Sequence, residues 1–213
     1  MESTSTVQQA ISEERNLPQF IKDIEELIAE IQYLYCLDEI PWVVGYSGVK
    51  DSTSVLQLVW TAISKLPKNK RKKKVYVITT DTLVENPIVS VWVASSLECI
   101  RIAAQEEELP IEPHLLKPKL QDTFWVNLIG RGYPSPRHGF RWCTERLKIW
   151  PTNHFIRDVV RVQGEVIVVL GTRKAESQTR AASMASHENQ DLRERFKAEN
   201  LHTKSAFYTG LPD

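Results

Sequence analysis

The chain of 213 residues has few cysteines, no excess charge of either sign and no long apolar run. Its three cysteines, Cys36, Cys99 and Cys143, form no CxxC pair, so their spacing predicts neither a zinc knuckle nor a disulfide framework. Such usage is typical of a reducing compartment. No apolar run approaches the length of a membrane span, and the polar stretch from Met1 to Leu17 lacks the apolar core of a signal peptide. We therefore expect a cytoplasmic protein.

Charge gives no overall indication of a partner. Lysine plus arginine number 27, as do aspartate plus glutamate, so the formal net charge is zero. A nucleic-acid partner would have to be argued from a local basic patch instead. The basic run over residues 68–74 is expected to be a solvated loop. Apolar residues make up 42% of the chain, which is ordinary for a globular protein with one substantial domain.

Two apolar patterns alternate along the chain. Helical spacing predicts amphipathic helices over four segments: 18–34, 53–63, 87–104 and 151–162. Short β-branched runs predict buried strands over 41–46, 75–80 and 165–170, and a further strand is expected over 111–116. This alternation predicts an α/β fold with a Rossmann-like parallel sheet and helices on both faces. In such sheets ligands bind beyond the carboxyl ends of the strands, where we expect the functional residues to meet.

A short loop joins the first predicted strand to the next helix. It reads Ser47, Gly48, Val49, Lys50, Asp51, Ser52 and Thr53. A helix that begins here offers unpaired N–H groups and the positive end of its dipole to an anion. Gly48 allows close approach of the backbone to phosphates, the hydroxyls act as donors, and Lys50 supplies a mobile positive charge. Asp51 is expected to cap the helix or to help hold a Mg²⁺ ion carried by a nucleotide.

The loop lacks the GxxxxGK[ST] pattern of a Walker A motif. It resembles the SGGxDS loop of the PP-loop ATP pyrophosphatases, which cleave ATP to AMP and pyrophosphate. Val49 stands where that motif has its second glycine. A β-branched residue at positive φ costs about 1–2 kcal/mol, so either Val49 has a negative φ or the loop is weakened. The alternative interpretation is an ordinary turn between strand and helix.

Two further motifs follow predicted strands. Asp81 ends the second strand, a position near the adenine and ribose in the resembled superfamily, or it caps a turn. Residues 171–180 follow the last strand and resemble the GxRxxES...R segment of PAPS-reductase-like proteins and of the small subunit of ATP sulfurylase. Arg173 and Arg180 would clamp phosphate oxygens, and Glu176 would orient an arginine or a metal-bound water. A charged surface helix is the alternative.

The segment 122–148 is irregular, aromatic and rich in arginine. Aromatic faces interleaved with arginines can stack bases and hold phosphates. Cys143 lies among Arg141, Arg146 and Lys148, which favours its thiolate, although a single cysteine can equally be a small buried residue.

Together these motifs resemble DndC, the PAPS-reductase-like component of bacterial DNA phosphorothioation. The resemblance covers roughly residues 20–185 and rests on six segments: 46–48, 51–53, 81–85, 124–134, 141–144 and 173–177. It implies an adenine nucleotide alpha hydrolase-like fold and hydrolysis of ATP with Mg²⁺. It also implies replacement of a non-bridging oxygen of a DNA phosphate by sulfur. The implied partners are DNA, a cysteine desulfurase that donates sulfur, and the other DNA phosphorothioation proteins.

The resemblance also assigns roles to individual residues. Those expected in catalysis are Lys50, Asp51, Arg173 and Glu176. Those expected to bind the nucleotide are residues 47–53, Asp81, Arg173 and Arg180. Family members hold a 4Fe–4S cluster on four cysteines, and Cys143 matches the first of these. We expect a flexible lead-in over residues 1–16, a PP-loop nucleotide-binding domain over 17–185, and a polar tail over 186–213 that begins a further region.

Two departures from the family weaken an enzyme assignment for this chain. Val49 replaces a loop glycine, and Cys36 and Cys99 do not match cluster positions, whereas a cubane held by cysteine needs about four thiolates. We therefore expect that the chain alone holds no cluster, and that it is a truncated form or a short relative. The main alternative is a non-catalytic nucleotide- or DNA-binding module of a larger complex. PAPS reduction and tRNA thiolation are disfavoured, because the ECGxH-type nucleophile and the CxxC pairs are absent.

Overall fold

The computed structural model describes residues 17–137, 139–172, 178 and 182. Four parallel strands form its single described sheet: β1 (Trp42–Gly45), β2 (Val75–Thr80), β3 (Ile111–Leu116) and β4 (Ile167–Val169). Their order is β3-β2-β1-β4, and Trp42 lies level with both Val75 and Ile167. The strands start in line, so their carboxyl ends reach the same edge. The predicted α/β fold with a parallel sheet is confirmed.

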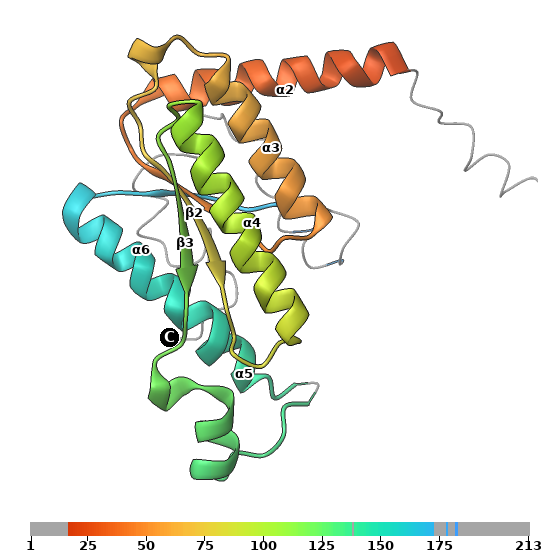
Figure 1. The fold of residues 1–213 in the computed structure, drawn as a ribbon, viewed down its shortest axis with the longest axis vertical. Coiled ribbons are helices and arrows are strands. Elements are labelled where there is room, and N and C mark those ends of the chain that lie inside the picture. The colour runs from red at the N-terminus through yellow and green to blue at the C-terminus, as the bar shows by residue number, and fades with distance from the viewer. Residues whose placement is uncertain (1–16, 138, 173–177, 179–181, 183–213) are drawn as a thin grey trace, which may run out of the picture.

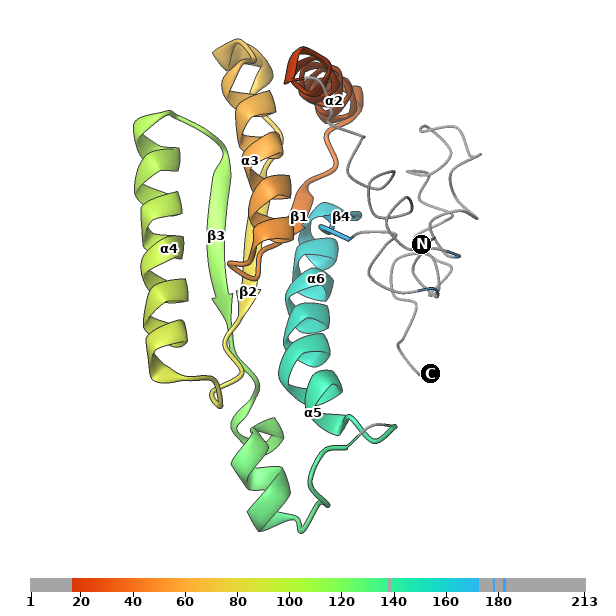
Figure 2. The same cartoon turned by 90° about the vertical axis from the view of Figure 1, so that its right-hand side faces the viewer.

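Helices cover both faces of this sheet (Figures 1 and 2). The long helices are α2 (Leu17–Leu37), α3 (Lys50–Ser64), α4 (Pro87–Glu106) and α6 (Trp150–Gln163). The helices α3 and α4 lie on one face with α2 beside α3, and α6 lies on the other (Figure 2). Local interactions explain the start of α4 and the end of α6. The Asn86 side chain accepts the N–H of Ile88 ahead of α4, and Gly164, at φ +85°, closes α6.

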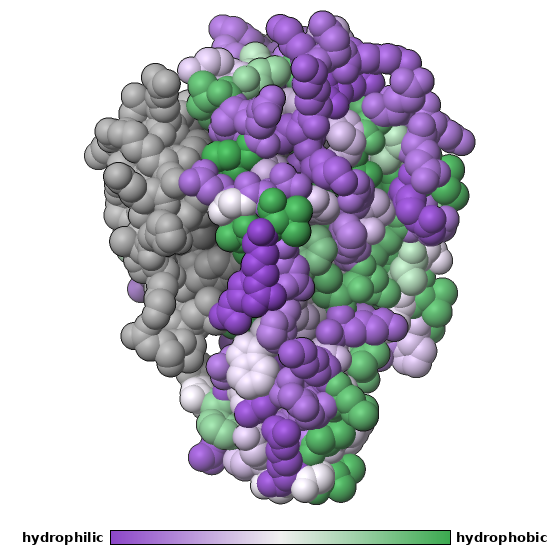
Figure 3. Space-filling model, turned by 90° about the vertical axis from the view of Figure 1, so that its left-hand side faces the viewer, coloured by the Kyte–Doolittle hydropathy of each residue, from purple (hydrophilic) through white to green (hydrophobic). Residues whose placement is uncertain are grey.

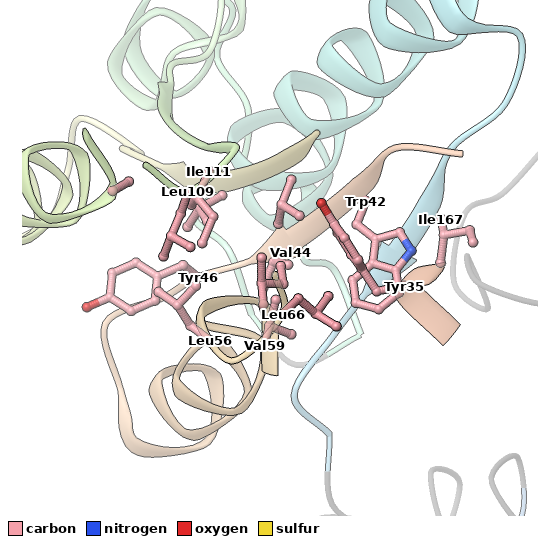
Figure 4. Packing of buried hydrophobic residues seen from close by; sticks show 14 of the residues in the cluster. Tyr35, Trp42, Val44, Tyr46, Leu56, Val59, Leu66, Leu109, Ile111 and Ile167 are labelled. Carbon is pink, nitrogen blue, oxygen red and sulfur yellow. The ribbon is translucent and has the colours of Figure 1, made fainter. Parts of the chain in front are cut away.

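The larger core lies between the sheet and the helices α2, α3 and α4 (Figure 4). Alternate strand residues such as Val44 and Val77 point into it, where they meet Leu56 and Val59 of α3. The smaller core lies on the opposite face, where Val43 and Ile78 join the apolar side of α6. Because both of their faces are covered, β1, β2 and β4 are mostly apolar, which is the pattern that predicted them. The edge strand β3 is an exception, since it carries Glu112 and His114.

The chain between β3 and α6 leaves the sheet and forms a compact excursion at the lower end of Figure 1. It contains a 3₁₀ turn at Leu120–Asp122, a π-helical segment η3 (Val126–Gly130), the short helix α5 (Trp142–Thr144) and a second π-helical segment η4 (Glu145–Ile149). The last of these continues directly into α6. The sequence predicted an irregular segment here, and its short, mixed helical turns account for the missing periodicity.

The basic run was predicted to be a solvated loop, and this is wrong for one lysine. Lys73 is buried, with its Nζ 2.7 Å from Oδ1 of Asp38 and about 5 Å from the ring centres of Tyr35 and Trp42. Burial lowers the pKa of Lys73, and the Asp38 carboxylate opposes that shift. A charge pattern alone cannot identify the one cation in a run that has a buried acid and two rings beside it.

Helix α4 also departs from the sequence prediction. No apolar run was expected to approach a membrane span, but α4 is long and apolar enough to cross a membrane by length and composition alone. In the structure it lies along the sheet, with Leu97 and Ala104 buried in the larger core. Its outer apolar residues, including Ile88 and Val91, are exposed.

Candidate nucleotide-binding site

A cavity of about 490 Å³ opens at the carboxyl ends of β1, β2 and β4. Its wall includes strand-end residues and the loops that follow, namely Gly45, Tyr46, Ser47, Val49, Asp51, Ser52, Ile78, Thr79, Thr80, Asp81, Glu85, Ser90, Val93, Leu115, Lys148, Thr152, Leu170, Gly171 and Thr172. The strand order reverses its direction between β1 and β4, because β4 lies on the opposite side of β1 from β2. Ligands of open α/β sheets bind at such a switch point.

The loop after β1 holds its glycine and its valine in different conformations. Gly48 has φ +74°, which favours glycine, whereas Val49 has φ −97° and ψ 166°, an extended conformation open to any residue. Val49 is the N-cap of α3, and its side chain points largely to solvent. The valine that replaces a motif glycine is therefore accommodated without backbone strain.

Hydroxyl groups hold this loop against the first turn of α3. The buried Ser52 Oγ accepts the backbone N–H of Ser47 at 3.1 Å and donates to the Val49 carbonyl at 3.0 Å. The Ser47 and Ser52 hydroxyls are 2.9 Å apart, and Thr53 Oγ1 donates to the same Val49 carbonyl at 3.0 Å. The sequence predicted these hydroxyls as ligand donors. In this structure the Ser52 and Thr53 hydroxyls donate within the loop and fix its shape.

Neighbouring segments hold the loop closely on two sides. A Cβ at Gly48 would lie 2.4 Å from a ring carbon of Trp92, so this indole of α4 rests directly on the turn. A Cβ at Gly171 would lie 2.8 Å from the carbonyl oxygen of Asp51, so the chain leaving β4 passes against the start of α3. Both glycines are thus required by close contact, and the loop lies between α4 and the segment after β4.

Two carboxylates of the cavity wall, Asp81 and Glu85, each lie near a lysine. Asp81 Oδ1 accepts the N–H of Leu83 at 2.9 Å, and Lys117 Nζ lies 3.9 Å from Oδ2 of the same carboxylate. The turn-capping alternative for Asp81 is thus observed, and the residue also lines the cavity. Glu85 Oε1 lies 3.8 Å from Lys148 Nζ, which comes from the opposite face of the sheet. The cavity wall therefore carries carboxylate oxygens, which are ligands that Mg²⁺ prefers, and a lysine ammonium that can pair with a phosphate.

The predicted site residues fall into three groups. Those that line the cavity are Ser47, Val49, Asp51, Ser52 and Asp81. Gly48, Lys50 and Thr53 belong to the same loop and first turn of α3 without forming part of the cavity wall. Arg173, Glu176 and Arg180 lie outside the described residues.

Sequence reasoning gave no nucleotide-site role to three residues that the structure places here. Lys148 and Thr152 reach the cavity from η4 and α6, and Trp92 reaches the loop from α4. Lys148 was considered only as a neighbour of Cys143. The spacing of these residues carried no signal, because they come from elements that meet only once the sheet has formed.

The described cysteines do not fit a shared iron–sulfur cluster. Cys36 and Cys99 are exposed on α2 and α4, and Cys143 is half-buried in α5. Within residues 17–172, position 138 excepted, no three His, Cys, Asp or Glu side chains are grouped so as to hold a metal ion.

The aromatic residues of the excursion stack largely on one another, so most of the rings that the sequence offered for base stacking have a partner within the protein. Phe124 stacks on Trp142 with ring centres 5.3 Å apart, and Tyr133 meets Trp142 edge-on. The Arg146 guanidinium lies 5.2 Å from the ring centre of Tyr133 and 4.6 Å from that of Trp150. The sequence alone could not separate these internal contacts from outward-facing rings. Two aromatic side chains of this segment remain exposed, Trp125 and Phe140.

The chain is similar to known proteins in both sequence and structure. No family model matches the sequence. An uncharacterized protein of Methanocaldococcus jannaschii, MJ0066, is 26% identical over 186 residues, which are 87% of this chain and 32% of the relative. The chain thus spans about a third of the length of this curated relative. Among solved structures, the chain is similar to the U34-tRNA thiolase NcsA from Methanococcus maripaludis, solved with its 4Fe–4S cluster. The similarity has 15% identity and a TM-score of 0.47, and it covers 86% of this chain and 56% of that chain.

Proposed function

We propose that the chain binds ATP and cleaves it to AMP and pyrophosphate, as the nucleotide-binding part of a sulfurtransferase that modifies DNA phosphate. The observation that carries the proposal is the Ser47–Thr53 loop. Its backbone turns at Gly48 into the N-terminus of a 15-residue helix, beside a cavity at the switch point of the sheet. The N–H groups of a first helical turn have no acceptor within their own helix and are suited to phosphate oxygens.

The charged groups of the cavity support the same ligand. Lys148 lines the cavity, and Lys50 lies in the first turn of α3, so both are near enough to the loop to reach phosphates by rotation of long side chains. Asp51, in the first turn of α3, would supply a carboxylate oxygen to a Mg²⁺ ion carried by the nucleotide. That ion would neutralise charge on the phosphates.

The reaction we propose has two transfers. An oxygen of the acceptor phosphate attacks the α-phosphorus of ATP, the bond to the bridging oxygen breaks, and pyrophosphate leaves with the electron pair. Hydrosulfide, the sulfur donor in its simplest chemical form, then attacks the activated acceptor phosphorus. AMP leaves with the electron pair and the proton of hydrosulfide passes to solvent, so that sulfur replaces one oxygen. Positive charge fixed at the loop stabilises the leaving pyrophosphate.

DNA as the acceptor rests on the motifs that resemble DndC. Segments 81–85 and 124–134 are two of the six that carry that resemblance. Asp81 and Glu85 of the first line the cavity, and the second lies in the neighbouring excursion. The specific activity, the cysteine desulfurase and the other phosphorothioation proteins belong to this proposal on the same ground.

The test is the release of AMP and pyrophosphate from ATP by the purified chain with DNA and hydrosulfide present, with ATP affinity measured separately by calorimetry. Ser47→Ala and Lys50→Ala should each weaken ATP binding by about tenfold, the loss expected for one hydrogen bond or ion pair to a charged group. Lys72→Ala is the control, because Lys72 is an exposed lysine at the other end of the sheet. An equal loss in all three variants would indicate nonspecific electrostatics and would contradict the proposal.

The alternative function, a non-catalytic nucleotide-binding module, predicts a different result from the same experiment. ATP would bind with the same dependence on Ser47 and Lys50, but no AMP or pyrophosphate would form. Matched release of AMP and pyrophosphate that Ser47→Ala abolishes would exclude this alternative.

A further inference from the structure

Positive charge is concentrated in one part of this neutral chain. Residues 117–157 form the excursion and the first half of α6. They contain eight lysines and arginines but only two acidic residues. Their net charge of +6 is balanced by −6 over the remainder of the chain. One of the two acids, Asp122, is already paired with Arg146 through a 3.1 Å contact. The excursion is thus a strongly basic surface on a protein of zero net charge, and such a local patch is the footprint of a polyanionic partner.

A second cavity, of about 290 Å³, lies within this basic region. Its wall is Leu115, Leu116, Lys117, Lys119, Asp122, Arg146, Trp150, Pro151, His154, Phe155 and Asp158. Leu115 lines both this second cavity and the nucleotide cavity. Along the chain, Lys148 and Thr152 line the nucleotide cavity, and the intervening Trp150 and the following His154 line the second cavity. The two cavities are therefore neighbours, separated by the end of β3 and the start of α6.

Two cations of the second cavity are paired, Lys117 with Asp81 and Arg146 with Asp122, whereas other polar side chains of its wall remain available to a ligand. Lys119 and His154 are exposed, and neither appears in an ion pair within the described residues. The acid at its rim, Asp158, is 3.1 Å from Arg161 and is thus partly neutralised. Figure 3 views the molecule from the side of α6, and hydrophilic side chains run down the middle of this face to the lower end.

An exposed ring stands on the same excursion. The indole of Trp125 is 57% exposed, although its neighbour Phe124 is fixed by stacking on the buried Trp142. The Asn127 side chain, which is fully buried, ties η3 to the preceding turn through Thr123 and accepts from Arg131. A large apolar ring held outward on a rigid, basic support is suited to stacking on an unpaired base.

From this arrangement we propose that the excursion binds single-stranded DNA, with the phosphate backbone in the second cavity and a base stacked on Trp125. The proposal rests on the proposed function, which makes a DNA phosphate the acceptor. The shared Leu115 wall would then bring the DNA backbone next to the nucleotide cavity. Lys119 supplies positive charge for the backbone, and unpaired strands are favoured because a base inside a duplex has no free face for Trp125.

The experiment is fluorescence anisotropy of a fluorescein-labelled 12-nucleotide single strand with the full chain, at several salt concentrations and without ATP. Lys119→Glu should weaken binding at least tenfold and lower the slope of log K against log salt by about one, because one phosphate contact is lost. Trp125→Ala should weaken binding on the order of tenfold while leaving that slope unchanged. The milder Lys119→Gln should show the same trend if Lys119→Glu disturbs folding.

Lys72→Glu is the matched control, since it makes the same change of charge on an exposed lysine at the opposite end of the sheet. Equal losses for Lys119→Glu and Lys72→Glu would overturn the proposal, as would tighter binding of an RNA strand or a duplex of the same sequence. Calorimetry with ATP on the same variants separates the two proposals. ATP binding that persists without DNA binding refutes this surface alone, whereas DNA binding without ATP binding refutes the proposed function.

Discussion

Among single residues, Gly48 is the position where the absence of a side chain matters most. Its φ of +74° and the Trp92 ring that would lie 2.4 Å from a Cβ impose two separate requirements for glycine. Gly48→Ala should weaken ATP binding by more than tenfold, because the loop must move away from the indole as well as leave its preferred conformation. Affinity measured by calorimetry, with the melting temperature as a check on folding, tests this expectation.

Gly132 offers a control for the conformational part of that effect. It has φ +67°, close to that of Gly48, but nothing lies within 4 Å of a Cβ built there. Gly132→Ala should therefore cost about 1 kcal/mol in stability and leave ATP affinity unchanged. If Gly48→Ala binds ATP as well as Gly132→Ala does, the contact with Trp92 does not shape the phosphate loop.

The second residue-scale prediction concerns the buried Lys73. The Lys73 side chain is 2% exposed and is paired with Asp38, while the Tyr35 hydroxyl donates to the Lys73 carbonyl at 2.6 Å. Burial raises the pKa of Tyr35 to about 12, which keeps this donor protonated. Asp38→Asn should lower the unfolding free energy by about 3 kcal/mol, because it leaves a buried cation without its counter-charge. Urea unfolding monitored by circular dichroism measures this loss.

Removing both charges should restore most of that stability. A double variant, Asp38→Asn with Lys73→Met, is expected to unfold within about 1 kcal/mol of the parent, since an apolar side chain can replace a buried ion pair. Glu26→Gln, which breaks the exposed pair with Lys22, serves as the control and should have almost no effect. A double variant as unstable as Asp38→Asn alone would show that the pair is not what stabilises this region.

At the scale of elements, the excursion depends on Arg146 of η4. Its guanidinium donates to Asp122 and to the Tyr133 hydroxyl and lies over the ring of Trp150, so it joins three segments. Arg146→Met should loosen residues 117–141 without unfolding the sheet, which has its own two cores. We expect hydrogen exchange of backbone amides in 117–141 to become at least tenfold faster, while exchange in β1 and β2 stays unchanged.

Arg161→Met is the comparison for this variant, because the Arg161 and Asp158 side chains are both more than two-thirds exposed. Loss of an exposed pair should leave exchange in the excursion as it is in the parent. Faster exchange throughout the chain in Arg146→Met would mean that the excursion and the sheet unfold as one unit, contrary to this expectation.

Most of the helices and strands could be predicted from the sequence. β2 and β3 were placed at their observed bounds and β1 and β4 within two residues. For β1, β2 and β4 the signal is a short apolar run between polar turns, because strands buried on both faces are apolar. The helix after the phosphate loop begins at Lys50, three residues before the predicted start, since no apolar residue marks its first turn. In the excursion, π-helical turns and a stacked aromatic cluster leave no period to detect.

For the molecule as a whole, the sequence predicted only those residues of the candidate site that directly follow a predicted strand. The Ser47–Ser52 loop and Asp81 follow strands directly, and the rule that ligands bind at strand ends brought them together. Lys148 and Thr152 come from across the sheet, and Trp92 from the outer side of the loop. Their positions depend on the angle at which α4 and α6 cross the sheet. That angle is set by the packing of apolar faces against each other, and local sequence does not reveal it.

The last prediction concerns the response of the whole fold to acid. His114 of β3 lies between Tyr76 of β2 and Phe155 of α6, with ring centres 5.6 and 4.8 Å away, so it joins the sheet to its covering helix. Its Nε2 has no hydrogen-bond partner among the described residues. Burial lowers the pKa of His114 below its usual 6.5, and Lys74 adds to this while Glu112 opposes it.

The sign of the effect follows from proton uptake. The folded chain binds a proton at His114 less readily than the unfolded chain does, so stability is complete above about pH 6.5 and falls as the pH drops through that value. His114→Phe should keep the ring packing and flatten this decline between pH 7.5 and 5.5. Because the side chain is 38% exposed, the difference in slope should stay below about 1.4 kcal/mol per pH unit. Urea unfolding across that range measures it. His154→Phe, on the exposed side of α6, is the control, and parallel slopes for His114→Phe and the parent would show that His114 does not link the fold to pH.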